Sequence, residues 1–213
     1  MMDEELLAEE IKEALGAQDQ ETSDESIGFA RAIIKEFTLK GLVNFAPGGI
    51  TGVAPPSGGP LINGAGSNGI ISGITGPSLA SNIVLFAGFP GASAEVLQFA
   101  ASFTSYVIST GKVAYKPGEV TGICSNTGAN PGVLTGEAKG GQVTGITGDG
   151  LASLIAPLFG SFTSEELKAF SNAVIDHIKT NAVITFVTGT VTGTASAGGG
   201  PLVAGAATAG RFS

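Results

Sequence analysis

Three features of the sequence could carry chemistry: a histidine, a cysteine and a glycine-rich run. His177 is the only histidine, which leaves no multi-histidine metal site, and Cys124 has no second cysteine for a disulfide or a CxxC motif. The run Gly64–Gly69 has the spacing of a dinucleotide-binding fingerprint. That fingerprint requires a helix to begin at its last glycine, and a second glycine-rich run, Ile70–Gly76, follows instead. The sequence therefore predicts no catalytic residue, no cofactor-binding residue and no metal ligand, and an enzyme is not expected.

An internal repeat accounts for most of the sequence. Phe29, Phe99 and Phe170 follow one another at nearly equal spacing, and the same residue types recur around them at fixed offsets. A serine stands at the same distance before each phenylalanine, and a Val-Thr-Gly or Ile-Thr-Gly triplet stands at the same distance after it. The repeat anchors are Ser23, Ser93 and Ser164, then Phe29, Phe99 and Phe170, then Gly52, Gly122 and Gly193.

Each copy predicts the same order of elements. The serine caps a helix whose apolar residues recur at helical spacing, a short strand follows, and a long glycine-rich arm ends the copy. A shorter helix precedes the second and third anchor helices and forms a helical hairpin with each. We therefore expect an α+β fold of three tandem repeats of about 70 residues, each a helix or helical hairpin followed by a short strand and a long glycine-rich arm.

The expected divisions are an acidic N-terminal helix and linker (residues 1–22), repeat 1 (23–92), repeat 2 (93–163) and a truncated repeat 3 (164–213). The arms are too long for ordinary connections and have little apolar patterning of their own. A segment of this kind folds only against something else, so we expect the arms to pack on another subunit. Three linked copies of one unit would then suit a ring or a trimeric axis.

The repeat also indicates what the histidine and the cysteine do. His177 aligns with Tyr106 and Glu36, and a position that accepts these three types is expected on the polar flank of a helix. Cys124 aligns with alanine in the other two copies, which predicts a small, packed side chain. The fingerprint keeps only its outer glycines in the other copies, so we interpret it as a by-product of the repeat.

Charge is scarce and unevenly placed. The segment from Met1 to Glu25 contains ten acidic side chains and a single lysine, whereas the whole of the chain after it contains only eight acidic and nine basic ones. So few charges on a surface of this size favour association, and we expect much of the surface to be buried against other subunits. The alternative is a monomer whose surface is covered by Gly, Ser, Thr and Asn, which also hydrate well. No basic patch predicts nucleic-acid binding, no apolar run is long enough to span a membrane, and the acidic N-terminus does not resemble a secretory signal.

The third copy resembles small virion proteins of tailed bacteriophages. The resemblance covers the anchor helix after Ser164, the extended exit Asn181–Ile184, the stretch Thr188–Gly193 and the Gly/Ala-rich tail. It implies a structural role in the particle, as a neck, tail, baseplate or capsid-cement part assembled in the host cytoplasm. The partners would be other copies of the chain and other virion proteins, without nucleic acid, membrane or a small-molecule substrate. The alternative is an extracellular or cell-surface fibre or adhesin subunit, which the Thr-Gly richness favours.

Overall fold

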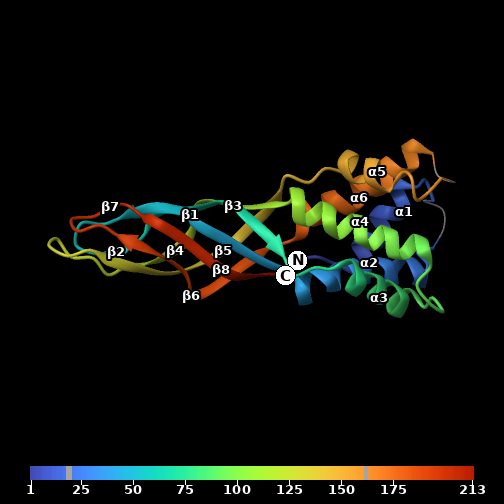
Figure 1. The fold of residues 1–213 in the computed structure, drawn as a ribbon. Helices are drawn as coiled ribbons and strands as arrows, with labels where there is room; N and C mark the ends of the chain where they lie inside the picture. The colour runs from blue at the N-terminus through green and yellow to red at the C-terminus, as the bar shows by residue number, and fades with distance from the viewer. Residues whose placement is uncertain (18–20, 161–162) are drawn as a thin grey trace. The chain divides into compact units, whose positions relative to one another are not determined.

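The computed structural model describes residues 1–17, 21–160 and 163–213, which form two compact units. The helical unit is made of three chain segments, Met1–Gly41, Gly73–Gly111 and Gly145–Ala182. The β unit is made of the three segments between and after them, Leu42–Ser72, Lys112–Thr144 and Val183–Ser213. The chain therefore passes from the helical unit to the β unit three times and back twice (Figure 1).

The described part of the helical unit contains three short and three long helices. The short helices are α1 (Glu4–Ala14), α3 (Gly76–Ala87) and α5 (Gly148–Ile155), and the long helices are α2 (Asp24–Lys40), α4 (Ala94–Thr110) and α6 (Ser164–Asn181). Each short helix packs between two long ones: α3 between α2 and α4, α5 between α4 and α6, and α1 between α6 and α2. The helices thus close a ring, and the N-terminal helix α1 completes it by docking on the last helix of the chain.

The three short helices bury equivalent residues. With Asp3, Thr75 and Thr147 as their N-caps, each helix places leucine four positions and isoleucine eight positions after the cap. These buried residues are Leu7, Leu79 and Leu151, then Ile11, Ile83 and Ile155. The chain therefore consists of three sections of the same make-up, residues 1–72, 73–144 and 145–213, each with a short helix, a long helix and a β-hairpin. These sections begin one short helix earlier than the divisions expected at residues 23, 93 and 164.

Hydroxyl caps start the long helices, as the sequence predicts, but not always at the expected residue. The side chains of Ser23 and Ser93 accept hydrogen bonds from the backbone three residues on, which confirms both as N-caps. Ser164 was expected to be the third cap and lies one residue inside α6. The cap is Thr163, whose hydroxyl accepts from the backbone N–H of Glu166 while the Glu166 carboxylate accepts from the backbone N–H of Thr163.

The β unit is a closed antiparallel barrel. Its six main strands are β1 (Leu42–Ala54), β3 (Ile62–Ser72), β4 (Lys112–Cys124), β5 (Gly132–Thr144), β6 (Ile184–Ala195) and β8 (Val203–Phe212). They pair in the order β1–β3–β4–β5–β6–β8, and β8 pairs again with β1. Two short strands extend this pattern: β2 (Gly59–Pro60) pairs with β4, and β7 (Gly200–Pro201) pairs with β1.

The predicted fold of three tandem helix–strand–arm repeats is wrong. The expected short strands are 12 or 13 residues long, and the glycine-rich arms are the partner strands β3, β5 and β8 of the same chain. Instead of forming three units side by side, the copies contribute equivalent elements to one helical ring and one barrel. The arms need no second subunit to fold, because the barrel supplies both neighbours of every arm strand.

Aromatic rings and glycines fill the barrel together. Phe45, Tyr115 and Phe186 point inward, and their ring centroids lie 5.8 to 6.0 Å apart. A Cβ on Gly69 would lie 2.5 Å from the Phe45 ring, and Gly141 and Gly210 leave the same space for the other two rings. The glycine-rich sequence of the arms is therefore explained by close packing against bulky residues of the neighbouring strands.

Candidate interaction surface

His177 is buried, which corrects the expectation that it lies on a polar flank. Its side chain is fully enclosed, and its Nε2 accepts a hydrogen bond from the backbone N–H of Asp3 at 3.3 Å. Its Nδ1 lies 2.8 Å from the Glu10 carboxylate. This pairing assigns the ring proton to Nδ1, which donates to Glu10. Both ring nitrogens are thus used to hold α1 on α6.

The residues that align with His177 do the same work in the other two copies. All three are buried, and each accepts the backbone N–H of the N-cap residue of a short helix; we call this set the polar clasp. The bonds are Thr75 N–Glu36 Oε1 at 2.8 Å, Thr147 N–Tyr106 OH at 2.9 Å and Asp3 N–His177 Nε2 at 3.3 Å. A carboxylate, a phenol and an imidazole can share this position because each offers an acceptor to the start of a helix. The clasp therefore holds the start of each short helix against a long helix.

Cys124 is the small, packed side chain that its alignment predicts. It is 1% exposed and lies inside the barrel at the level of Ala54 and Ala195, which are equally buried. Burial raises the pKa of the Cys124 thiol, so the thiol stays protonated at neutral pH and is a poor nucleophile.

The run Gly64–Gly69 lies within strand β3 and begins no helix. Gly64, Gly66 and Gly69 face the inside of the barrel, where a Cβ on Gly64 would lie 2.1 Å from the Val120 carbonyl oxygen. The backbone at this run is occupied by strand pairing with β1 and β4. Its N–H groups are therefore not arranged to receive a phosphate.

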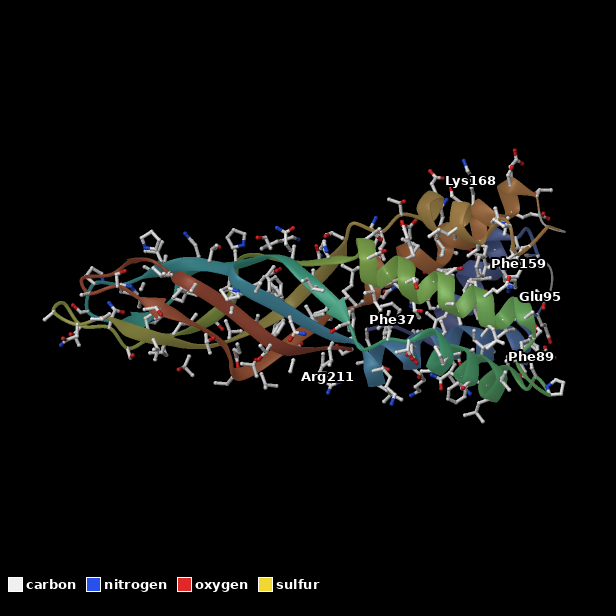
Figure 2. The ribbon with its side chains drawn as sticks, viewed as in Figure 1. Phe37, Phe89, Glu95, Phe159, Lys168 and Arg211 are labelled. Carbon is white, nitrogen blue, oxygen red and sulfur yellow. The ribbon has the colours of Figure 1, made fainter. Side chains whose placement is uncertain are left out.

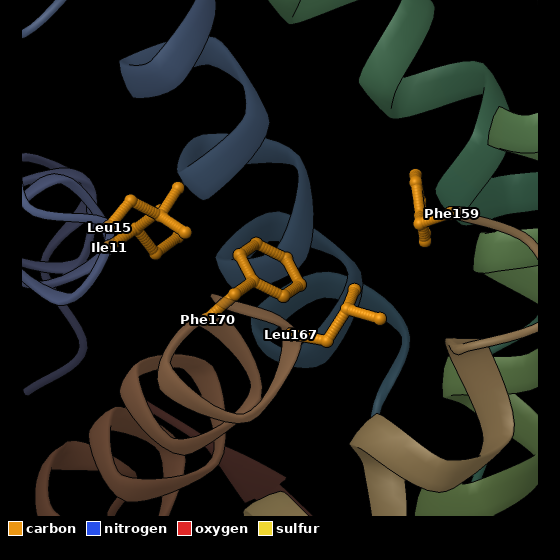
Figure 3. Close-up of a pocket in the computed structure, with 5 residues that line it drawn as sticks. All are labelled: Ile11, Leu15, Phe159, Leu167 and Phe170. Atoms are coloured by element: carbon orange, nitrogen blue, oxygen red, sulfur yellow. The ribbon is translucent and has the colours of Figure 1, made fainter. Parts of the chain in front are cut away.

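An apolar cavity of about 140 Å³ lies within the helical unit. Its lining residues are Ile11, Leu15, Phe159, Leu167 and Phe170, drawn in Figure 3. Because all five are apolar, they offer no group that could orient a polar substrate. Among the residues that the structure describes, no three His, Cys, Asp or Glu side chains are grouped so that they could hold a metal ion.

The anchor phenylalanines meet although they come from three separate sections of the chain. The Phe29, Phe99 and Phe170 ring centroids lie 5.4, 6.0 and 6.1 Å from one another. Their environments are not equivalent, because Phe99 is 2% exposed whereas Phe29 and Phe170 are half-buried. Phe99 also contacts Phe103 and Phe159. The three rings form one aromatic cluster that joins α2, α4 and α6.

The anchor glycines leave space for a layer of leucines that points into the barrel. A Cβ on Gly52 would lie 2.8 Å from Leu61, and Gly122 and Gly193 are equally close to the leucine of their own hairpin. Those leucines are Leu61, Leu134 and Leu202. The backbone N–H of Leu61 donates to the Gly122 carbonyl, so the layer also ties one hairpin to the next. A Cβ at any of these three positions would require the neighbouring leucine side chain to shift.

A belt of uncharged side chains surrounds the barrel outside this leucine layer. Each copy contributes three residues to the belt: the residue after the anchor glycine, and the residues immediately before and after the leucine of the leucine layer. The belt consists of Val53, Pro60, Ile62, Ile123, Val133, Thr135, Thr194, Pro201 and Val203, all exposed. The five Val and Ile side chains with large apolar surface are 42 to 58% exposed. A set of exposed apolar residues this large marks an interaction surface.

The sequence contains a signal for this belt. A strand with one buried face usually alternates apolar and polar residues. The triplets Pro60–Ile62 and Pro201–Val203 are apolar at every position, so the face opposite the inward-pointing leucine must be apolar too. The sequence-based reasoning assigned these triplets to the arms and missed what they imply for the barrel exterior.

Charge divides sharply between the two units. The β unit has four basic and two acidic residues among its 95, whereas the helical unit has six basic and 16 acidic ones, which give net charges of +2 and −10. The whole first hairpin, Leu42–Ser72, carries no charged residue. Arg211 of the barrel and Glu95 and Lys168 of the helical unit are exposed and project from the ribbon in Figure 2. The barrel exterior is thus nearly uncharged.

One of its few charges, Glu137, stands two residues beyond the belt residue Thr135 on β5. A hydrogen bond from the Thr188 hydroxyl, together with Lys139, holds the pKa of Glu137 below its usual value. Glu137 therefore remains ionised at neutral pH and bounds the uncharged belt on this strand.

Comparisons with known proteins return no match: no family model, no curated protein and no solved structure matches the chain. Within the described residues, no helix combines the length and the hydropathy needed to cross a membrane. The interaction surface therefore has to be interpreted from its own geometry.

Proposed function

We propose that this chain is a structural component of a larger assembly, a tailed-phage virion, and is not an enzyme. The observation that carries the proposal is the exterior of the barrel. The β unit has six charged residues among its 95, and a closed belt of uncharged, mostly apolar side chains faces outward. A surface of this kind is costly to leave in water and favours burial against other proteins.

Two further features support the proposal. The buried histidine has structural hydrogen-bond partners, and the cysteine is packed inside the barrel. The two residues whose side chains are the most reactive types in the sequence therefore have structural roles. The chain also presents three similar sections in each unit, which suits a position on a threefold axis of a particle. The resemblance of the third section to small virion proteins supplies the choice of a tailed phage.

The test is sedimentation of the chain from the cells that produce it. Lysates are separated on a density gradient, and the chain is detected by antibody in each fraction and counted per particle by mass spectrometry. We expect it in phage-sized particles at a fixed copy number. Recovery only as a slowly sedimenting monomer, while complete particles lack it, would refute the proposal, and recovery with sheared surface filaments would favour the fibre alternative.

A further inference from the structure

The belt around the barrel is a closed circuit. Strand pairing joins Pro201 to Val53 and Val53 to Ile62 on the first side of the barrel. The same pairing joins Pro60, Ile123 and Thr135 on the second side, and Val133, Thr194 and Val203 on the third side. Val133 and Thr135 lie two apart on β5 and therefore point the same way. Leu61 alone separates Pro60 of β2 from Ile62 of β3, and Leu202 alone separates Pro201 of β7 from Val203 of β8. Both members of each pair are exposed, so the belt continues from one to the other. The circuit therefore passes every strand of the barrel and returns to its start.

This geometry restricts what can cover the belt. A partner that docks on one side contacts at most about half of a cylinder and leaves the remaining apolar side chains in water. A partner that surrounds the barrel covers the whole circuit at once. No belt residue is charged, so enclosure would not remove a charge from water at the level of the contact.

The composition of the belt further restricts the symmetry of the partner. The position after the anchor glycine is Val53, Ile123 or Thr194, and the position after the leucine is Ile62, Thr135 or Val203. Three faces with similar size and polarity can each be met by the same surface of a repeated subunit. A single asymmetric partner would have to provide three similar surfaces of its own.

We propose that the belt is enclosed by a ring of three identical partner subunits, each of which lays an apolar surface on one third of the circuit. The inference rests on the proposed assembly function and specifies its partner: a threefold ring with an uncharged, apolar inner wall. The barrel would then lie in the central opening of that ring. The absence of free strand edges at the closed barrel directs the contact to side chains and away from strand addition.

Site-specific photo-crosslinking in the assembled particle tests this proposal. Benzoyl-phenylalanine is introduced separately in place of Ile62, Val133 or Val203, one residue on each side of the circuit, and the crosslinked peptides are identified by mass spectrometry. We expect all three positions to capture the same peptide of one partner protein. The control is Val187, a valine of β6 that is 66% exposed and outside the belt, where we expect at least tenfold less of that crosslink.

A matched pair of charge variants provides the second measurement. Val133→Asp places a carboxylate in the belt and should reduce incorporation into particles at least tenfold. Val187→Asp places the same group outside the belt, at a position where the second section already has Lys116, and should incorporate normally. Circular dichroism and thermal melting of both purified variants establish that the barrel is folded.

The outcomes separate the two proposals. If the chain is in particles but crosslinks from only one side, captures three unrelated peptides, or captures lipid or a second copy of itself, the ring is wrong and the assembly function stands. Normal incorporation of Val133→Asp also overturns the ring. If the chain enters no assembly in its native source, the proposed function itself fails.

Discussion

Phe99 stabilises the helical unit more than either of its two counterparts, because it is the anchor ring with no appreciable exposure and the most aromatic neighbours. We expect Phe99→Ala to lower the free energy of unfolding by roughly 3–5 kcal/mol, the usual cost of removing a core phenylalanine. Phe29→Ala should cost clearly less, since Phe29 is half-buried. Urea unfolding followed by helical circular dichroism measures both. An equal loss of unfolding free energy in the two variants would contradict the prediction that Phe99 contributes more to stability than Phe29.

Tyr115 differs from its counterparts Phe45 and Phe186 by a hydroxyl that donates to the Ile184 carbonyl at 2.8 Å. Burial, and then the nearby Glu119 carboxylate, raise the pKa of Tyr115 above its ordinary value. A phenol in the unfolded chain ionises near pH 10, so this group favours the folded state below pH 10 and loses that contribution as the pH rises further.

Tyr115→Phe tests this sign. Near neutral pH the variant should be less stable by about 1 kcal/mol, the net value of one hydrogen bond. Above pH 10 the wild-type barrel should lose stability more steeply than the variant, so the gap should close or reverse. Urea unfolding at pH 8, 10 and 11 measures the difference, and parallel declines of the two proteins would contradict the prediction.

At the scale of the elements, the polar clasp decides whether a short helix stays docked. His177→Phe keeps the ring volume but removes the acceptor for Asp3 and the donor for Glu10. We expect amide hydrogen exchange within α1 to rise at least tenfold while exchange in α3 and α5 is unchanged. Tyr106→Phe is the matched variant, since it removes the partner of Thr147 and should affect α5 alone. A uniform rise over all helices would show that the clasp acts on the whole unit.

Strand β8 closes the barrel, and its removal should unfold the β unit. An arm that packs only on another subunit could be deleted without harm to the fold, but deletion of Gly189–Ser213 removes half of β6 and leaves β1 without its β8 partner. We expect the truncated chain to lose its β-sheet signal in circular dichroism. Deleting residues 128–129 from the exposed β4–β5 loop is the control and should leave the barrel intact. A folded barrel in the first deletion would contradict the closed topology.

The elements differ in how well the sequence predicts them. The long helices are predictable because serine caps and apolar spacing are local signals, and Ser23 and Ser93 are caps as expected. Strand β3 is not, because its inward positions except Ile71 are glycines, so apolar and polar residues do not alternate along it. The side chains that fill this space, such as Phe45, come from neighbouring strands. Pairing information of that kind is absent from a local pattern.

The interaction surface was even less accessible from the sequence. The scarcity of charged residues indicated that the protein associates with other subunits, but it did not indicate which part of the surface makes the contact. The apolar triplets Pro60–Ile62 and Pro201–Val203 indicate an apolar exterior at two points. Strand register is needed to place Val53 beside Ile62 and Ile123 beside Pro60 and so to join these points into a belt. The polar clasp likewise joins residues far apart in the sequence, such as Glu36 and Thr75, and dissimilar side chains at one repeat position conceal a shared role.

For the whole molecule, the equivalence of the three sections predicts a circular permutant. Residue Ser213 aligns with Ser72 and Thr144, and Met1 aligns with Gly73 and Gly145, which have positive φ angles of 84° and 81°. Joining Ser213 directly to a Met1→Gly chain and opening it between Ser72 and Gly73 should therefore recreate a native connection. We expect the permutant to melt within about 5 °C of the parent, a difference of one to two kcal/mol for a chain of this size. An unfolded permutant, with a soluble parent measured alongside, would show that the sections are not interchangeable.

The closure of both units by the ends of the chain has a consequence during synthesis. Helix α1 docks on α6, and β1 pairs with β8, so α1 and β1 have no partner there until these later elements have been synthesised. While the ribosome is still translating, β1 presents an unpaired edge within a hairpin that carries no charge to discourage pairing with another nascent chain. Slow translation or crowded polysomes should therefore increase aggregation, and a chaperone that shields the first hairpin should raise the yield. The native fold can be completed only after residues 203–212 have left the ribosomal tunnel.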